Sequence, residues 1–316
     1  MMRRSSVTAL VAHVLLTLLV ASSGLAAELR LRESLLQQQR DKATITVTAT
    51  VSHLGDEAHP LATQLSSEDC DLHVPLRSRD IRVPFIGEVK NACSEVPSGE
   101  GVKYWHDAIY DETHGVAAEV AGVFRIWLEH PPKAPRDVQS EAVQVPSYTN
   151  SNPDHQLELH PILQIGTLDF RGHVKQIKEG QTVGKGYGTA QLATVLNKMI
   201  TIQRIRLQDE PYIRIRGVKS GYNHWTLRGT VSQAPEALAD GSVFRVDIPG
   251  VAKAKNIPVV SIEGTAAHQQ VQTLNVGDPV RFLALVRMHV ATVLNEVSTT
   301  ARQIPLPIEF ILLHLE

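Results

Sequence analysis

Short runs in which apolar and polar residues alternate dominate this chain and restrict it to a mainly β fold. Thr44 to Ser52 places apolar side chains on one face and threonines on the other, and Leu72, Val74 and Leu76 repeat the same two-residue period. Side chains two apart on a strand point to the same face, so each run predicts a strand with one buried side. The 17 prolines and 20 glycines are typical of the many turns that join such strands.

The predicted strands form two groups, separated by a glycine-punctuated segment from Gly166 to Gly188. A run over residues 308–315 ends the second group, and its alternation requires a partner sheet. One good helical stripe occurs, between Tyr187 and Ile200, and a second short helix is an option over residues 290–297. The residues of the stripe are Leu192, Val195, Leu196 and Met199.

Five short strands with a helix or long loop after the third make the element list of an OB-like Greek-key barrel. The predicted fold is therefore mainly β, with two small OB-like barrels and one short helix between them or within the second. Two β-sandwiches are the alternative, because sequence does not reveal strand order. A chain of 316 residues suits more than one domain. We expect a signal peptide over residues 1–27, a first β domain over 28–166, and a second over 167–316 with its helix near 187–200.

Four short segments of the first group recur in the same order in the second group. The pairs are 50–52 with 230–232, 72–74 with 243–246, 83–86 with 257–260, and 157–159 with 308–310. Tandem duplication is one interpretation, and chance similarity among short strands is the other. If the chain is duplicated, the second copy lacks Asp71, His73 and His160. The fold would then not require these residues, which makes them better functional candidates.

Three polar clusters, at residues 69–73, 127–131 and 152–161, each place a carboxylate close to an imidazole. Imidazoles and carboxylates that converge from separate strands can bind zinc or manganese, and the bound ion can activate water for hydrolysis. The other interpretation is a structural polar network without a cofactor, because no self-sufficient metal motif is present. The candidate metal ligands are Asp71, His73, Glu129, Glu158 and His160.

The spacing within two of these clusters makes a geometric prediction. Asp71 and His73 are two residues apart, as are Glu158 and His160, so each pair shares a strand face. Strands remote in sequence become neighbours in a closed barrel. We expect His73 and His160 to approach one another, with Glu129 or His130 nearby, at one end of the first domain.

A basic and aromatic stretch between residues 204 and 228 is the second candidate site. Barrels that bind single strands or anionic sugars combine a positive groove with stacking aromatic rings. The alternative is a solvated sheet face with cross-strand ion pairs. The predicted binding residues are Arg214, Arg216, Tyr222 and Trp225.

No nucleophile elbow, Walker loop or dinucleotide fingerprint occurs, and no residue is assigned a catalytic role. The formal net charge of −2 gives no general attraction to polyanions. The predicted function is a non-catalytic binding or structural β module whose partner is an anionic polymer, such as a glycan or nucleic acid, or another protein. The alternative is a metal-dependent hydrolase that uses Asp71, His73, Glu158 and His160.

The first residues have the pattern of a secretory signal. Arg3 and Arg4 precede an apolar run from Val7 to Ala21, and small residues follow at positions 24–27. We therefore expect export to the periplasm or the cell exterior and no membrane span in the mature chain. The only two cysteines, Cys70 and Cys93, predict a disulfide in an exported chain, with two free buried thiols as the alternative.

Residues 66 to 166 resemble uncharacterised secreted bacterial proteins that share three strand motifs. The motifs are D-x-H, G-x-W-R-x-W-x-E-H-P and N-P-D-H-x-x-E-x-H-P. In this chain Phe124 replaces the first aromatic residue of the second motif, and Cys70 occupies a position where glycine is more usual. The change at Cys70 suits a pairing with Cys93. The resemblance implies no activity; it supports the domain boundary and the list of site residues.

Overall fold

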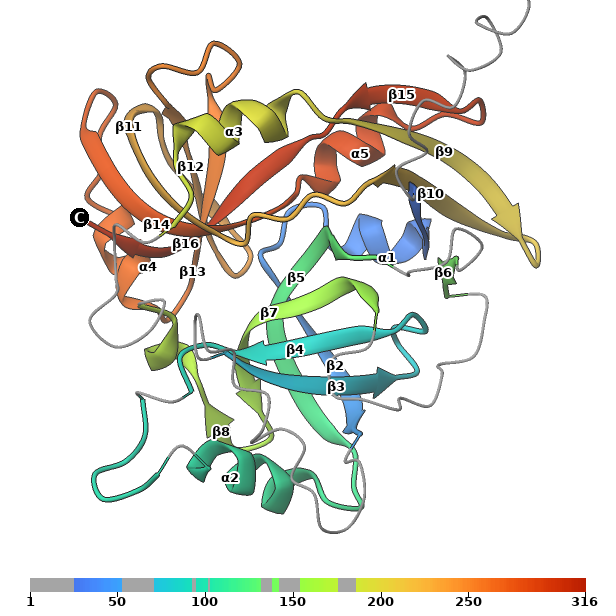
Figure 1. Cartoon of the computed structure of the whole chain (residues 1–316), viewed down its shortest axis with the longest axis vertical. Helices are drawn as coiled ribbons and strands as arrows, with labels where there is room; N and C mark the ends of the chain where they lie inside the picture. Colours follow the sequence, from blue (N-terminus) through green and yellow to red (C-terminus); the bar gives the residue numbers. More distant parts are fainter. Residues whose placement is uncertain are drawn as a thin grey trace, which may run out of the picture.

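The computed structural model describes residues 26–52, 71–92, 95–101, 103–131, 138–141, 154–175 and 186–316. The chain is mainly β, as predicted, and forms two barrels and a separate five-stranded sheet (Figure 1). Most of the predicted signal peptide, and both Cys70 and Cys93, lie outside the described residues, so the cleavage and the disulfide stay predictions. None of the helices in the described part has the length and apolar character needed to cross a bilayer.

The first barrel has the strand order β2-β3-β4-β7-β5, and β5 pairs with β2 to complete the ring. The third and fifth strands of this ring, β4 and β7, pair in parallel, and all other pairs are antiparallel. Helix α2 (Tyr104–Thr113) lies between the third and fourth strands, and β8 (Leu168–Asp169) extends the sheet beyond β7. This is the OB order that the element list predicted. The strands are β2 (Thr44–Val51), β3 (Leu72–Ser78), β4 (Phe85–Val89), β5 (Ala118–His130) and β7 (His155–Ile165).

The second barrel repeats this order as β11-β12-β13-β16-β14, with β13 and β16 parallel. Helix α4 (Ala266–Val271) again lies between the third and fourth strands, and α5 (Val290–Glu296) forms where the second short helix was considered. Strand β16 is buried and pairs with β13 and β14, which confirms the prediction for the end of the chain. The strands are β11 (His224–Leu238), β12 (Gly241–Asp247), β13 (Ile257–Ile262), β14 (Pro279–Met288) and β16 (Ile308–Leu315).

The four repeated sequence segments lie in equivalent places in the two barrels. They fall in or beside β2 and β11, β3 and β12, β4 and β13, and β7 and β16, which are the first, second, third and fifth strands. Chance similarity would not be expected to respect this order, so the topology favours tandem duplication.

A third sheet contains segments from both halves of the chain, in the order β15-β9-β10-β1-β6. Strand β1 pairs with β10 along its whole length, from Ala26 opposite Val218 to Arg32 opposite Tyr212. The predicted boundary near residue 166 therefore separates the two barrels, whereas this sheet crosses it. The strands are β1 (Ala26–Arg32), β6 (Gln139–Ser140), β9 (Met199–Leu207), β10 (Glu210–Val218) and β15 (Arg302–Pro305).

The predicted central helix is shorter than its apolar stripe. Helix α3 (Thr189–Leu196) buries Leu192, Val195 and Leu196, but Met199 begins strand β9 and is 41% exposed. Helix α1 (Glu33–Gln38) and the 3-10 helix η1 (Arg171–Lys175) were not predicted. Both are too short to give a readable helical period.

The two barrels pack side by side, so several of their strands are buried on both faces. β4, β13 and nearly all of β7 and β16 contain only buried residues. An apolar layer of residues from both barrels fills part of this contact. Its members are Ala43, Val123, Leu163, Val174, Val260, Ile262, Leu283, Leu285, Ile311 and Leu313.

The same buried ion pair occurs in each barrel, between the fourth and fifth strands. Arg125 contacts Glu158, its partner in the β5–β7 register, and Arg287 Nε donates to Glu309 Oε1 at 2.9 Å, its partner in β14–β16. Each arginine also reaches the opposite barrel. Arg125 Nε donates to the Val286 carbonyl at 2.8 Å, and Arg287 Nη1 donates to the Phe124 carbonyl at 2.9 Å.

Replacing Glu309 with glutamine should strongly destabilise the protein, because it leaves the buried Arg287 charge uncompensated between the barrels. Breaking a buried ion pair of this kind costs about 3–5 kcal/mol. The free energy of unfolding in urea measures the loss. As a control, Arg281→Ala removes an exposed arginine paired with Glu316 and should cost less than about 1 kcal/mol. Equal losses in the two variants would contradict the role given to the buried pair.

Candidate functional site

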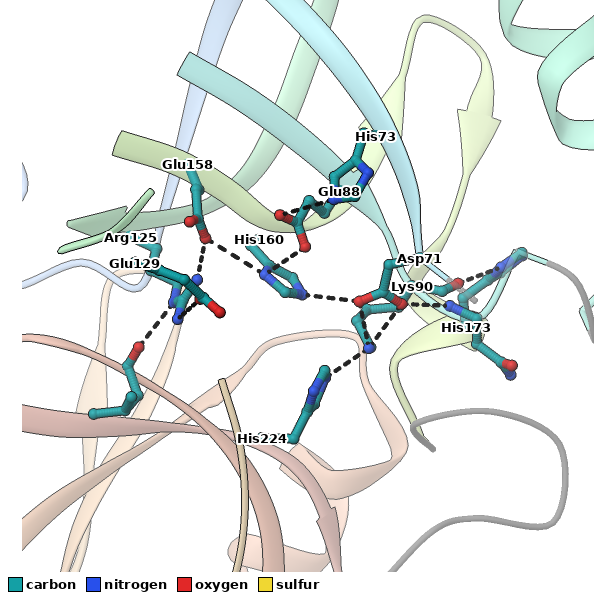
Figure 2. Close-up of polar contacts among 12 residues, drawn as sticks. Asp71, His73, Glu88, Lys90, Arg125, Glu129, Glu158, His160, His173 and His224 are labelled. Atoms are coloured by element: carbon teal, nitrogen blue, oxygen red, sulfur yellow. Dashed lines mark hydrogen bonds and ion pairs between the residues drawn. The ribbon is translucent and has the colours of Figure 1, made fainter. Parts of the chain in front are cut away.

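A network of ionisable side chains lies beside the interface between the barrels (Figure 2). The first barrel supplies nearly all of it, from β3 and the residue before it, from the end of β4 and the residue after it, and from β5 and β7. The second barrel contributes His224, the first residue of β11. The members are Asp71, His73, Glu88, Lys90, Arg125, Glu129, His155, Glu158, His160 and His224.

His160 lies at the centre of the network, among three carboxylates. Its Nδ1 is 2.9 Å from Glu88 and 3.5 Å from Glu158, and its Nε2 is 3.3 Å from Asp71. Burial alone would lower the pKa of His160, but the charge of Glu88 and the contacts with all three carboxylates raise it well above its usual value. His160 is therefore an imidazolium that neutralises part of this acidic group.

Lys90 joins the two barrels. Its ammonium donates to both oxygens of Asp71, at 2.8 and 2.7 Å, and to Nε2 of His224 at 2.7 Å. An ammonium only donates, so the His224 ring accepts at Nε2 and is neutral. Burial, reinforced by the Lys90 charge, holds the pKa of His224 well below its usual value. Burial would raise the pKa of Asp71, but Lys90 and His160 outweigh it, and the pKa is lowered.

Arg125 connects the network to the second barrel. It contacts Glu158 and lies 3.5 Å from Glu129, and Glu158 also accepts from His155 Nε2 at 3.2 Å. Burial opposes ionisation of Glu158, but Arg125 and His155 hold its pKa far below the usual value. Glu129 differs, because burial raises its pKa against the charge of Arg125.

The structure brings together three of the five predicted metal ligands, Asp71, Glu158 and His160. His73 reaches the same group through Glu88, since its Nε2 lies 3.6 Å from the carboxylate that also contacts His160. His73 and His160, which were predicted to approach one another, thus both contact the Glu88 carboxylate. Glu129 is linked to the group through Arg125.

Sequence analysis missed Glu88, Lys90, Arg125 and His224. Glu88 and His73 are opposite one another in the β3–β4 register, but neither cluster spacing nor alternation shows which strands pair. His224 comes from the other barrel, which no local pattern reveals. A signal existed for Arg125, because an arginine between apolar residues precedes both repeated segments, Arg125 before 157–159 and Arg287 before 308–310.

The donor atoms alone would suit a divalent metal. The ligand atoms of Asp71, His160 and His224 lie within 4.8 Å of one another, as do those of Glu88, Glu158 and His160. However, positively charged side chains of the protein already occupy both sets of possible ligands. The Lys90 ammonium sits against Asp71 and His224, and a metal bound to His160 would have to displace its proton. These residues fit a charge-balanced network better than a metal centre.

The charges of the six most deeply buried carboxylates and cations of the network balance one another. Three carboxylates, Asp71, Glu88 and Glu158, face three cations, Lys90, Arg125 and His160, and all six residues are at most 4% exposed. Pockets of about 570 and 450 Å³ lie elsewhere, and no network residue lines either of them. These six side chains are therefore enclosed by the residues that the structure describes.

Comparisons with known proteins do not assign the chain to a family. No protein-family model matches it, and no curated protein matches it. The resemblance to secreted bacterial proteins stays a prediction. The interpretation of both candidate sites consequently depends on their own chemistry.

The predicted binding residues do not form one site. Arg214 and Arg216 lie on β10 in the third sheet, whereas Trp225 lies on β11 in the second barrel. The Trp225 ring is fully buried, with Phe310 edge-on at 5.8 Å, and its Nε1 donates to the Tyr222 carbonyl. The predicted stacking role of Trp225 is wrong, because neither ring face is available to a ligand. Tyr222 is only partly buried.

Two histidines should give the stability of the protein an optimum near neutral pH. The pKa of His224 lies below its usual 6.5, so the unfolded chain takes up the extra proton and stability falls as the pH drops below about 6.5. The pKa of His160 lies above 6.5, so its contribution is present below about 6.5 and is lost as the pH rises through the raised pKa.

His224→Gln retains an acceptor for Lys90 and should flatten the acidic side of this profile, reducing its slope by up to about 1.4 kcal/mol per pH unit. His160→Gln should flatten the alkaline side instead. Urea unfolding across a series of pH values measures both slopes. An acidic side that His224→Gln leaves unchanged would contradict the neutral state assigned to this histidine.

Proposed function

We propose that this chain is a non-catalytic binding protein that holds an anionic polymer on one face of its third sheet. The observation that carries the proposal is that Arg30 on β1 and Arg214 on β10 lie directly opposite one another in the register. Like charges placed opposite each other on paired strands destabilise a sheet. A bound anion would turn this unfavourable pair into a favourable site.

Neighbouring residues extend this face, because residues opposite one another on paired strands share a face. Arg216 is opposite Glu28, Arg32 is opposite Tyr212, and Arg214 is opposite Gln203 on β9. The four arginines, Arg30, Arg32, Arg214 and Arg216, are called the arginine face below. Each of them keeps at least part of its side chain exposed.

Ion pairs neutralise only part of the arginine face. Glu28 binds both Arg216 and Arg30, the latter at 2.7 Å, and Glu141 accepts from Arg32 Nε at 3.3 Å. Burial would raise the pKa of Glu28, but its hydrogen bonds from Arg216 and Arg30 outweigh this and lower it. Arg214 bonds to the neutral Gln203. Four arginines thus face two carboxylates, which supports an excess of positive charge.

The non-catalytic part of the proposal is supported by the buried network. Its side chains include the types used by hydrolases, but each is engaged by a neighbour, and all except His73 and Glu129 are buried. We assign the network to holding the barrels together. Export, predicted from residues 1–27, would place the arginine face in the periplasm or outside the cell, where acidic glycans are available ligands.

Binding to a heparin oligosaccharide and to single-stranded DNA tests the proposal, with the affinity measured at several salt concentrations. The double variant Arg30→Ala/Arg214→Ala should bind more weakly, and for DNA the slope of log affinity against log salt should fall by about 1.4, or about 0.7 for each lost contact. Arg281→Ala, on the second barrel, is the matched control and should behave as the wild type. Identical binding by the double variant and the wild type would refute the proposal.

The alternative, a metal-dependent hydrolase built on Asp71, His73, Glu158 and His160, makes an opposite prediction for metal content. Because Lys90 and the His160 proton occupy the donor groups, we expect less than one equivalent of zinc or manganese after purification with these metals present. Elemental analysis of the wild type and of His160→Ala measures this. Stoichiometric metal that disappears in His160→Ala would favour the hydrolase.

A further inference from the structure

Strand β2 of the first barrel has an open edge. Along one side it pairs with β5 from Thr44 to Ala49, but along the other it pairs with β3 only from Ala49 to Val51. Within the described residues, no strand lies beside Thr44–Thr48 on the β3 side. An unpaired strand edge presents backbone N–H and C=O groups that can pair with another chain.

Three hydrogen bonds establish which backbone groups point to this open side. Thr44 N donates to Asp240 Oδ2 at 2.7 Å, Thr48 N to Asp80 Oδ2 at 3.3 Å, and Ser52 N to the Pro75 carbonyl of β3 at 2.9 Å. Alternate residues of a strand direct their backbone groups to the same side. The N–H and C=O of Thr46 therefore also point to the open side.

Two aspartates thus cap the open edge, and Thr46 lies between them. Asp240, in the turn between β11 and β12, also accepts from Ala43 N at 2.9 Å, so it closes the start of the edge. Asp80, just after β3, closes the other end at Thr48. Thr46 is exposed, and in the described part of the chain neither its N–H nor its C=O has a partner on this side.

A pocket of about 570 Å³ lies along this edge. Its wall includes Thr44, Ile45, Thr46 and Val47 of β2, and both capping aspartates. Arg32 and Lys42 also line it, so its lining carries two acidic and two basic side chains. The volume is in the range of pockets that bind small ligands.

We propose that this pocket binds a short extended peptide, which adds a strand to the edge of β2 and pairs its main chain with Thr46. Peptides that extend a sheet gain affinity from main-chain hydrogen bonds, and the side-chain pockets supply specificity. The charges of the lining suit a ligand that is itself zwitterionic. Lys42 is exposed and lines this pocket, where its ammonium can meet a free carboxylate of the peptide.

The peptide site is separate from the arginine face in its binding chemistry. The arginine face would recognise repeated negative charge, whereas the edge of β2 would recognise an amide backbone. Arg32 belongs to the arginine face and also lines the pocket, but Arg30 and Arg214, whose replacement tests the arginine face, do not line it. Either site can therefore fail its test without affecting the other.

The test compares Thr46→Pro with Thr46→Ala, using trialanine as the probe and the backbone amide signals of the protein as the readout. Proline removes the N–H that would pair with the peptide, and it is tolerated at a strand edge where the N–H makes no ladder bond. Alanine keeps the N–H and changes only the side chain. We expect trialanine to shift the signals of residues 44–48, and to bind Thr46→Pro about tenfold more weakly than Thr46→Ala.

A second comparison tests the direction of the peptide. Lys42→Ala should weaken the binding of trialanine but not of trialanine with an amidated C-terminus. Thermal unfolding of each variant shows that it is folded. Equal affinity of Thr46→Pro and Thr46→Ala, or no shift of residues 44–48 at about 10 mM trialanine, overturns the proposal.

Discussion

Two buried arginines, each bonded to the backbone of the opposite barrel, are the constraint on which this structure depends. A guanidinium carries five N–H donors and stays charged, so it must be surrounded by acceptors when it is buried. Arg287 finds them in Glu309 and in the carbonyls of Lys42, Ala43 and Phe124. The acceptors of each arginine come from both barrels, so neither barrel satisfies its own arginine alone.

The polar network of the first barrel is built on this contact. It starts where Arg125 meets the Val286 carbonyl, passes through Glu158, His160, Asp71 and Lys90, and ends at His224 of the second barrel. Both ends of the network therefore lie on the second barrel. A network anchored in this way holds the relative position of the barrels, because a displacement would break charged contacts at two separate points. Partly broken buried networks are costly, since each charge left unpaired loses its solvation without compensation.

The shared strand order of the two barrels separates what both contain from what is found in the first alone. The Arg–Glu pair is present in both barrels, so it belongs to the shared architecture. In the second barrel, His289 is the one histidine that contacts Glu309 among the described residues, at 3.9 Å, and the pair lies beside a pocket of about 450 Å³. In the first barrel the equivalent pair is surrounded by His155, His160 and Glu88. The histidine-rich part thus occurs in the first barrel and has no counterpart among the described residues of the second.

Much of the fold could be predicted from the two-residue period, including the closing strand β16 and the OB element list. The period loses its meaning where both faces of a strand are buried, as in β4 and β7. Trp225 was predicted to face a ligand because basic and aromatic residues surround it in the sequence, but it belongs to the core at the start of β11, where His224 and Trp225 are both buried. Within the site, the structure brings together Asp71, Glu158 and His160, which spacing had grouped and which come from β7 and from the residue before β3. Spacing could not identify Glu88, Lys90 or His224, because these partners are set by strand pairing and barrel packing.

The residues that most resemble catalytic groups by type are therefore those whose bonding capacity is already used within the protein. A carboxylate or imidazole can act on a ligand only if some of its donors or acceptors are free and accessible. In the network, Asp71 is bonded by Lys90 and the Asn91 backbone, and His160 is enclosed by three carboxylates. Binding capacity remains instead where charge or backbone is incompletely matched, at Arg30 opposite Arg214 and at the open edge beside Thr46. Those two surfaces consist of ordinary residue types, so their arrangement, rather than their composition, makes them candidates for recognition.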